Sequence, residues 1–61
     1  MNLVESHPTD STQFRLNLSL SAWEQMNAWL HENGISYYSA GDGYIGFKTE
    51  KDAILFALRW A

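Results

Sequence analysis

The side chains that perform most enzyme chemistry are few in this sequence of 61 residues. Cysteine is absent, which excludes disulfides and thiolate metal sites. The two histidines, His7 and His31, are far apart and lack the spacing of a zinc site. Gly41, Gly43 and Gly46 have the spacing of a hairpin, whereas a phosphate-binding loop places its glycines between a strand and a helix.

The acidic residues also lack a pattern typical of general acid–base catalysis, which needs two carboxyl groups converging in a pocket. Asp42 lies in a predicted turn, and Glu50 and Asp52 are acids that favour the start of a helix. His31 falls on the polar side of a predicted helix, and His7 lies in a polar leader. We therefore expect a protein that is not an enzyme and that binds no cofactor and no metal.

Charge and hydropathy narrow the remaining function classes. The net charge is −3, and the four cations are scattered along the chain. Nucleic-acid binding depends largely on neutralising phosphates, so this composition does not favour it. No apolar run approaches the roughly 20 residues that span a bilayer, and the N-terminus lacks the pattern of a signal peptide. We expect a cytoplasmic protein that contacts no membrane.

The first half of the sequence predicts a strand and a helix after a leader. Residues 1–12 are polar and predict a flexible leader, which leaves residues 13–61 as a single domain. Apolar and polar residues alternate over 13–20, as in a strand with one buried face. Ser21 with Glu24 matches a capping box and predicts that a helix begins there.

The second half predicts a hairpin and a final helix. Asn33 and Gly34 end the first helix, and residues 35–39 and 44–49 form strands joined by the turn at 41–43. Thr49 caps a helix that runs to the end of the chain. The order βαββα predicts an α+β fold with a three-stranded sheet and both helices on one face. It is similar to a ferredoxin-like split unit that lacks its last strand, which leaves the first strand at a sheet edge.

The final helix carries more apolar surface than one sheet face can cover. Ala53, Phe56 and Trp60 share the side that faces the core, whereas Leu55 and Leu58 lie on the opposite side. Contiguous exposed apolar surface usually marks an interaction site. The alternative is that the first helix or the leader covers these leucines. We predict that Leu55, Leu58 and Trp60 contact a partner or a second copy.

The side of the sheet without helices is the second candidate surface. Tyr38 and Tyr44 alternate away from their core-facing neighbours and share this side with Arg15 and Lys48. These rings either pair across strands, which stabilises a sheet by itself, or stack on a base or on a side chain of a partner. A single-stranded nucleic-acid binder using these four residues is the alternative function, and a structural subunit of a larger assembly is another.

Two stretches resemble known families. The segment 43–47 followed by 49–53 is similar to the third strand and second helix of RNA-recognition motifs, but Asp42 and Gly46 replace the basic and aromatic residues expected there. The ending from Phe47 to Trp60 resembles the C-terminal strand and helix of small phage-encoded accessory proteins. The second resemblance implies an inhibitor-like module that binds a host protein. We expect such a non-catalytic, protein-binding module, with a homodimer as one of its states.

Overall fold

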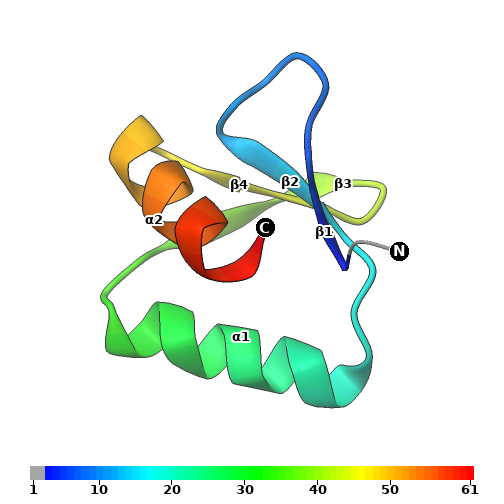
Figure 1. Ribbon diagram of the computed structural model, residues 1–61, viewed down its shortest axis with the longest axis vertical. Helices are drawn as coiled ribbons and strands as arrows, with labels where there is room; N and C mark the ends of the chain where they lie inside the picture. The colour runs from blue at the N-terminus through cyan, green and yellow to red at the C-terminus, as the bar shows by residue number, and fades with distance from the viewer. Residues whose placement is uncertain (1–2) are drawn as a thin grey trace.

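The computed structural model describes residues 3–61 and shows an α+β domain (Figure 1). The elements in chain order are β1 (Val4–Ser6), β2 (Gln13–Leu16), α1 (Leu20–Glu32), β3 (Tyr37–Gly41), β4 (Tyr44–Phe47) and α2 (Glu50–Trp60). The four strands form one sheet in the order β1-β2-β4-β3, and all neighbouring pairs are antiparallel. The prediction of a three-stranded βαββα sheet is therefore wrong.

The additional strand comes from the segment predicted to be a leader. Val4 pairs with Leu16, and Ser6 pairs with Phe14, so that β1 covers the outer edge of β2. This is the edge that the predicted split unit would leave open. A three-residue strand is too short to show an alternating pattern, and its pairing with β2 depends on contacts distant in sequence.

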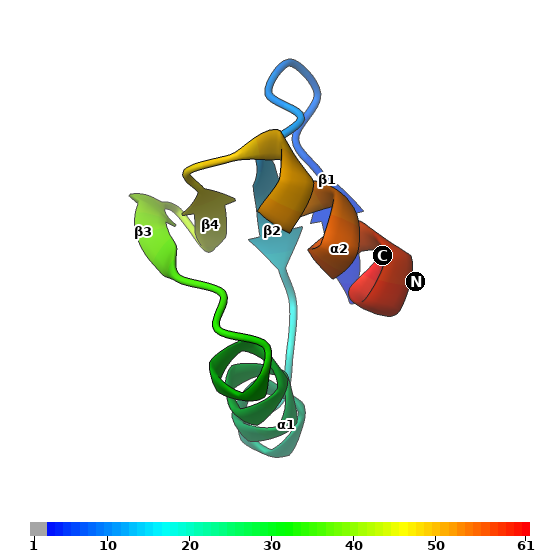
Figure 2. The same ribbon diagram turned by 90° about the vertical axis from the view of Figure 1, so that its left-hand side faces the viewer.

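The rest of the sheet contains a crossover connection. Because β4 is antiparallel to both β2 and β3, these two strands run in the same direction on either side of it. α1 forms the connection between them. Figure 2 shows the strands in a row, with α2 near β1 and β3 at the opposite edge.

The boundary between β2 and α1 differs from the prediction. β2 ends at Leu16, and the helix begins at Leu20 with Ser19 as its N-cap. The Ser19 hydroxyl accepts a hydrogen bond from the N–H of Ala22 at 3.2 Å. Ser21, the predicted cap, instead lies inside the first helical turn. Both serines satisfy the residue preference of a cap, but the chain leaves the strand earlier than its alternating pattern indicates.

The turn signals of the second half are confirmed. Asn33 is the C-cap of α1, and Gly34 follows it with φ of 65°. The hairpin turn places Gly41, Asp42 and Gly43 at positive φ, which glycine adopts at little cost. Thr49 caps α2, as predicted.

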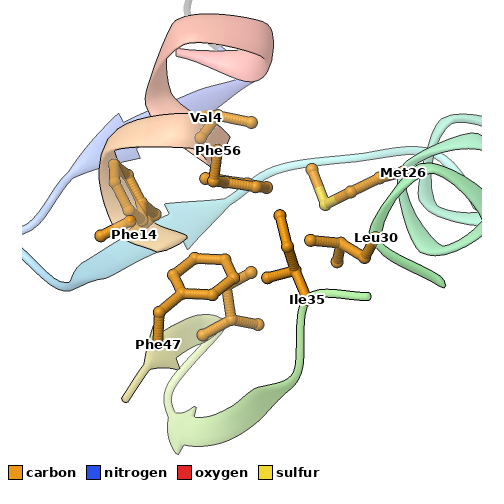
Figure 3. Packing of buried hydrophobic residues seen from close by; sticks show 9 residues of the cluster. Val4, Phe14, Met26, Leu30, Ile35, Phe47 and Phe56 are labelled. Carbon is orange, nitrogen blue, oxygen red and sulfur yellow. The ribbon is translucent and has the colours of Figure 1, made fainter. Parts of the chain in front are cut away.

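One core joins the sheet to both helices (Figure 3). Phe56 of α2 is fully buried, and its ring centre lies 4.9 Å from those of Phe14 in β2 and Phe47 in β4. Met26 and Leu30 of α1 point into the same cluster. The remaining members are Val4, Ile35, Ile45 and Ala53. Both helices therefore cover the same face of the sheet and leave the other face open.

Candidate functional site

The side of α2 that faces away from the sheet carries three exposed apolar side chains. Ile54, Leu55 and Leu58 expose 57%, 43% and 81% of their surface. Leu58 lies one helical turn beyond the other two, so that the three side chains are neighbours on one helix face. We call these three residues the outer patch.

Two cations flank the outer patch. Lys51 and Arg59 lie one turn before and one turn after Leu55, and both are exposed. The guanidinium carbon of Arg59 lies 4.4 Å from the centre of the Trp60 ring, a distance typical of a cation–π contact. The outer patch therefore has a cation on each side of it along the helix, and the first turn of α2 also carries the acids Glu50 and Asp52.

The opposite side of α2 fixes the position of the outer patch. At the start of the helix, the Thr49 hydroxyl accepts a hydrogen bond from the N–H of Asp52 at 3.2 Å. One turn later Phe56 enters the core between Phe14 and Phe47. Because this side is capped and buried, the outer patch is presented on a helix with a defined orientation.

Trp60 does not join the leucines with which the sequence grouped it. Its ring is half-buried and packs edge-on against Trp29 of α1, with 6.3 Å between ring centres. Its indole Nε1 is buried and has no hydrogen-bond partner among residues 3–61. Trp60 therefore connects the two helices, and the outer patch contains Ile54 in its place.

Tyr38 lies flat on the open face of the sheet. The register pairs it with Gly46 of β4. A Cβ placed on Gly46 would lie 2.7 Å from Cε2 of Tyr38, which shows that the ring rests directly on the glycine backbone. The side chain is 41% exposed. Glycine at position 46 thus makes room for a tyrosine ring, a cross-strand arrangement that also stabilises a sheet.

Tyr44 contributes to the same open face. It lies opposite Arg15 of β2, and Arg15 in turn lies opposite Glu5 of β1. The ring of His7 meets the Tyr44 ring edge-on, with 5.2 Å between centres. The structure thus places Tyr38, Tyr44 and Arg15 on one surface and adds His7, which the sequence placed in a solvated leader.

His7 and Asp10 shape the loop between β1 and β2. The Nδ1 atom of His7 accepts hydrogen bonds from the N–H groups of Thr9 and Asp10, each at 3.1 Å. The Asp10 carboxylate accepts from the Thr12 hydroxyl at 2.6 Å and from its N–H at 2.9 Å. These bonds hold the pKa of Asp10 below its ordinary value of 3.8. Both side chains thus stabilise the conformation of the loop.

The other polar side chains do not converge on a reaction centre. In the described part of the chain, no group of three His, Cys, Asp or Glu side chains is placed to hold a metal ion. None of the helices in residues 3–61 is long and apolar enough to cross a membrane.

Two features of these surfaces were not predicted from the sequence. Ile54 was not among the residues predicted to contact a partner, although its side chain is more exposed than that of Leu55. The contact of Tyr38 with Gly46 depends on strand register, but a glycine between Ile45 and Phe47 was the available signal of a close approach.

No protein-family model, no curated protein and no solved structure matches this chain in comparisons with known proteins.

Proposed function

We propose that the protein is a small non-catalytic binding module that holds a protein partner through the outer patch of α2. The observation that carries this proposal is the exposure of Ile54, Leu55 and Leu58 side by side on a helix whose other side is buried. Scattered exposed leucines are ordinary, but contiguous ones usually mark an interaction site.

The size of the patch indicates what kind of partner it needs. Burying a large aliphatic side chain completely contributes about 1.5–3 kcal/mol, and these three are already partly covered. Association itself costs several kcal/mol in lost translational and rotational freedom. A flat contact with these three side chains alone would be weak. A partner groove that encloses α2 and also contacts Lys51 and Arg59 fits better.

The resemblance of the terminal strand and helix to small phage-encoded proteins supports one class of partner. On that basis we propose that the module acts as an accessory or inhibitor protein toward a host protein. A homodimer through the same patch is the alternative occupant.

We expect Leu55→Glu combined with Leu58→Glu to weaken partner binding at least a hundredfold without unfolding the domain. Both side chains are exposed, so two carboxylates there cost the free domain little, whereas they cannot be buried in an apolar groove. The measurement is capture from a lysate of the cells that produce the protein, with thermal unfolding followed by circular dichroism.

The matched control is Leu20→Glu. Leu20 is 74% exposed and lies at the start of α1, apart from the outer patch. The control should keep every partner that the unsubstituted protein captures. Equal capture by the double variant, or its unfolding, would show that the outer patch is not the contact surface. Sedimentation of both variants separates a heterologous partner from a second copy.

A second candidate is stacking of a single-stranded nucleic acid on the open face. The flat, 41% exposed ring of Tyr38, with Arg15 on the same face, favours it. The net charge of −3 works against it. A gel shift at low and high salt distinguishes the two functions, because phosphate contacts weaken steeply as salt rises.

A further inference from the structure

A second surface lies at the edge formed by β3. Within residues 3–61, β3 pairs with β4 alone, so its other side has no strand beside it. The opposite edge of the sheet is formed by the three residues of β1, whereas β3 has five. Such an edge presents backbone donors and acceptors to any chain that approaches it.

The hydrogen bonds of β4 show which groups these are. The N–H of Phe47 donates to the carbonyl of Thr12, and the N–H of Leu16 donates to the carbonyl of Gly43, both at 2.9 Å. In an antiparallel ladder, the residues that bond to one neighbour alternate with those that bond to the other. The odd-numbered residues of β4 therefore bond toward β2, and the even-numbered ones bond toward β3.

This alternation determines the orientation of β3. Gly46 is even-numbered and lies opposite Tyr38, so the backbone of Tyr38 bonds toward β4. The N–H and C=O groups of Tyr37 and Ser39 then point away from the sheet. These groups form the free edge, and an extended segment of another chain is the structure that satisfies them.

A groove of about 540 Å³ runs between this edge and α1. Its lining combines the apolar side chains of Leu30 and Ile35 with polar ones, and Tyr37 belongs to both the groove and the edge. The hydroxyl of Tyr37 donates to Oδ1 of Asn27 at 3.2 Å and so links β3 to α1. The lining residues are Glu24, Asn27, Ala28, Leu30, His31, Ile35, Ser36 and Tyr37.

Glu24 is the only Asp, Glu, Lys or Arg side chain among the residues that line this groove. Residues 16–47 contain Glu24, Glu32 and Asp42 and no lysine or arginine. The four acids outside this range are balanced by the four cations, which also lie outside it. Residues 16–47 thus carry an excess of three acids, and the cation Lys48 lies directly after β4, at the end that pairs with Tyr37.

We propose that the β3 edge and this groove receive an extended, basic segment of a protein by strand addition. The free backbone groups of Tyr37 and Ser39 hold the segment, the groove takes an alternate side chain, and Glu24 attracts its cations. A second copy is a poorer occupant, because its own groove brings another Glu24 and is lined by no lysine or arginine. This surface is separate from the outer patch, since α2 lies near β1.

The test uses a synthetic hexapeptide of alternating lysine and valine, titrated into the isotopically labelled protein and followed by NMR. We expect the amide signals of Tyr37–Gly41 and of Glu24 to shift, with tighter binding at low salt. A matched peptide with glutamate in place of lysine should bind at least tenfold more weakly. Equal binding of both peptides, or shifts confined to α2 or the open face, would overturn the proposal.

Two variants test the two parts of the site. Ser39→Pro removes an outward N–H at an edge position that tolerates proline, and it should weaken peptide binding at least tenfold while the fold persists. Glu24→Gln should weaken binding several-fold and reduce its dependence on salt. The control, Glu5→Gln, changes a carboxylate on β1 at the other edge and should have no effect. If Ser39→Pro unfolds the domain, the test rests on Glu24→Gln. Peptide binding by Glu24→Gln that equals binding by Glu5→Gln would then overturn the proposal.

Discussion

Replacement of Phe56 by alanine is expected to remove about 3–5 kcal/mol from the free energy of unfolding. Phe56 is completely buried and lies against the rings of Phe14 and Phe47. At about 0.05–0.15 kcal/mol per residue, a domain of this size has about 3–9 kcal/mol of stability in total. The variant should therefore be largely unfolded or close to it. Urea denaturation followed by circular dichroism measures the change.

The control for this prediction lies two residues away on the same helix. Leu58→Ala removes a side chain that is 81% exposed, and it should change the free energy of unfolding by no more than about 0.5 kcal/mol. Comparing the two changes in the free energy of unfolding shows which side of α2 is buried and which is exposed. Similar costs for the two substitutions would contradict the orientation of α2.

Val4→Asp is expected to destabilise the domain by about 3–5 kcal/mol, the cost of an unpaired charge in a core. Val4 is 4% exposed and belongs to the same cluster as Phe56 (Figure 3). A carboxylate there has to be desolvated, or the strand has to leave the sheet. Either event uncovers the edge of β2. Thermal unfolding of the variant at neutral pH provides the measurement.

The neighbouring residue supplies the control. Glu5 is exposed on the open side of the same strand, and Glu5→Ala should leave the melting temperature nearly unchanged. If Val4→Asp unfolds at the same temperature as the unsubstituted protein, β1 contributes nothing to the domain. The sequence-based expectation of a leader would then describe these residues better than the strand does.

Sequence reasoning succeeded where the structural signal is local. The cap at Thr49, the end of α1 at Gly34 and the turn at Gly41–Gly43 each depend on a few consecutive residues, and all three are confirmed. Helix geometry alone also predicts that Phe56 and Leu58 lie on different sides of α2. The same periodicity that predicts the helix therefore predicts which of its side chains are exposed.

Apart from the N-cap of α1, which is Ser19 and not the predicted Ser21, the failures concern contacts between residues distant in sequence. β1 forms because Val4 and Ser6 pair with residues twelve and eight positions away, and its three residues carry no pattern of their own. The number of strands and the edge beside β2 depend on that addition, whereas β3 lies at the opposite edge. The position of Tyr38 over Gly46 is likewise a consequence of register. These features could not be predicted without knowing how the strands pair in the sheet.

The central claim is that the outer patch touches a partner, and site-specific photo-crosslinking tests it most directly. A photoreactive side chain is introduced at position 58 in one sample and at position 20 in another, and each is irradiated in the cells that produce the protein. Our account predicts a discrete adduct from position 58 that disappears when Leu55→Glu is added, and none from position 20. Adducts of equal yield from both positions, or none from position 58, would contradict it.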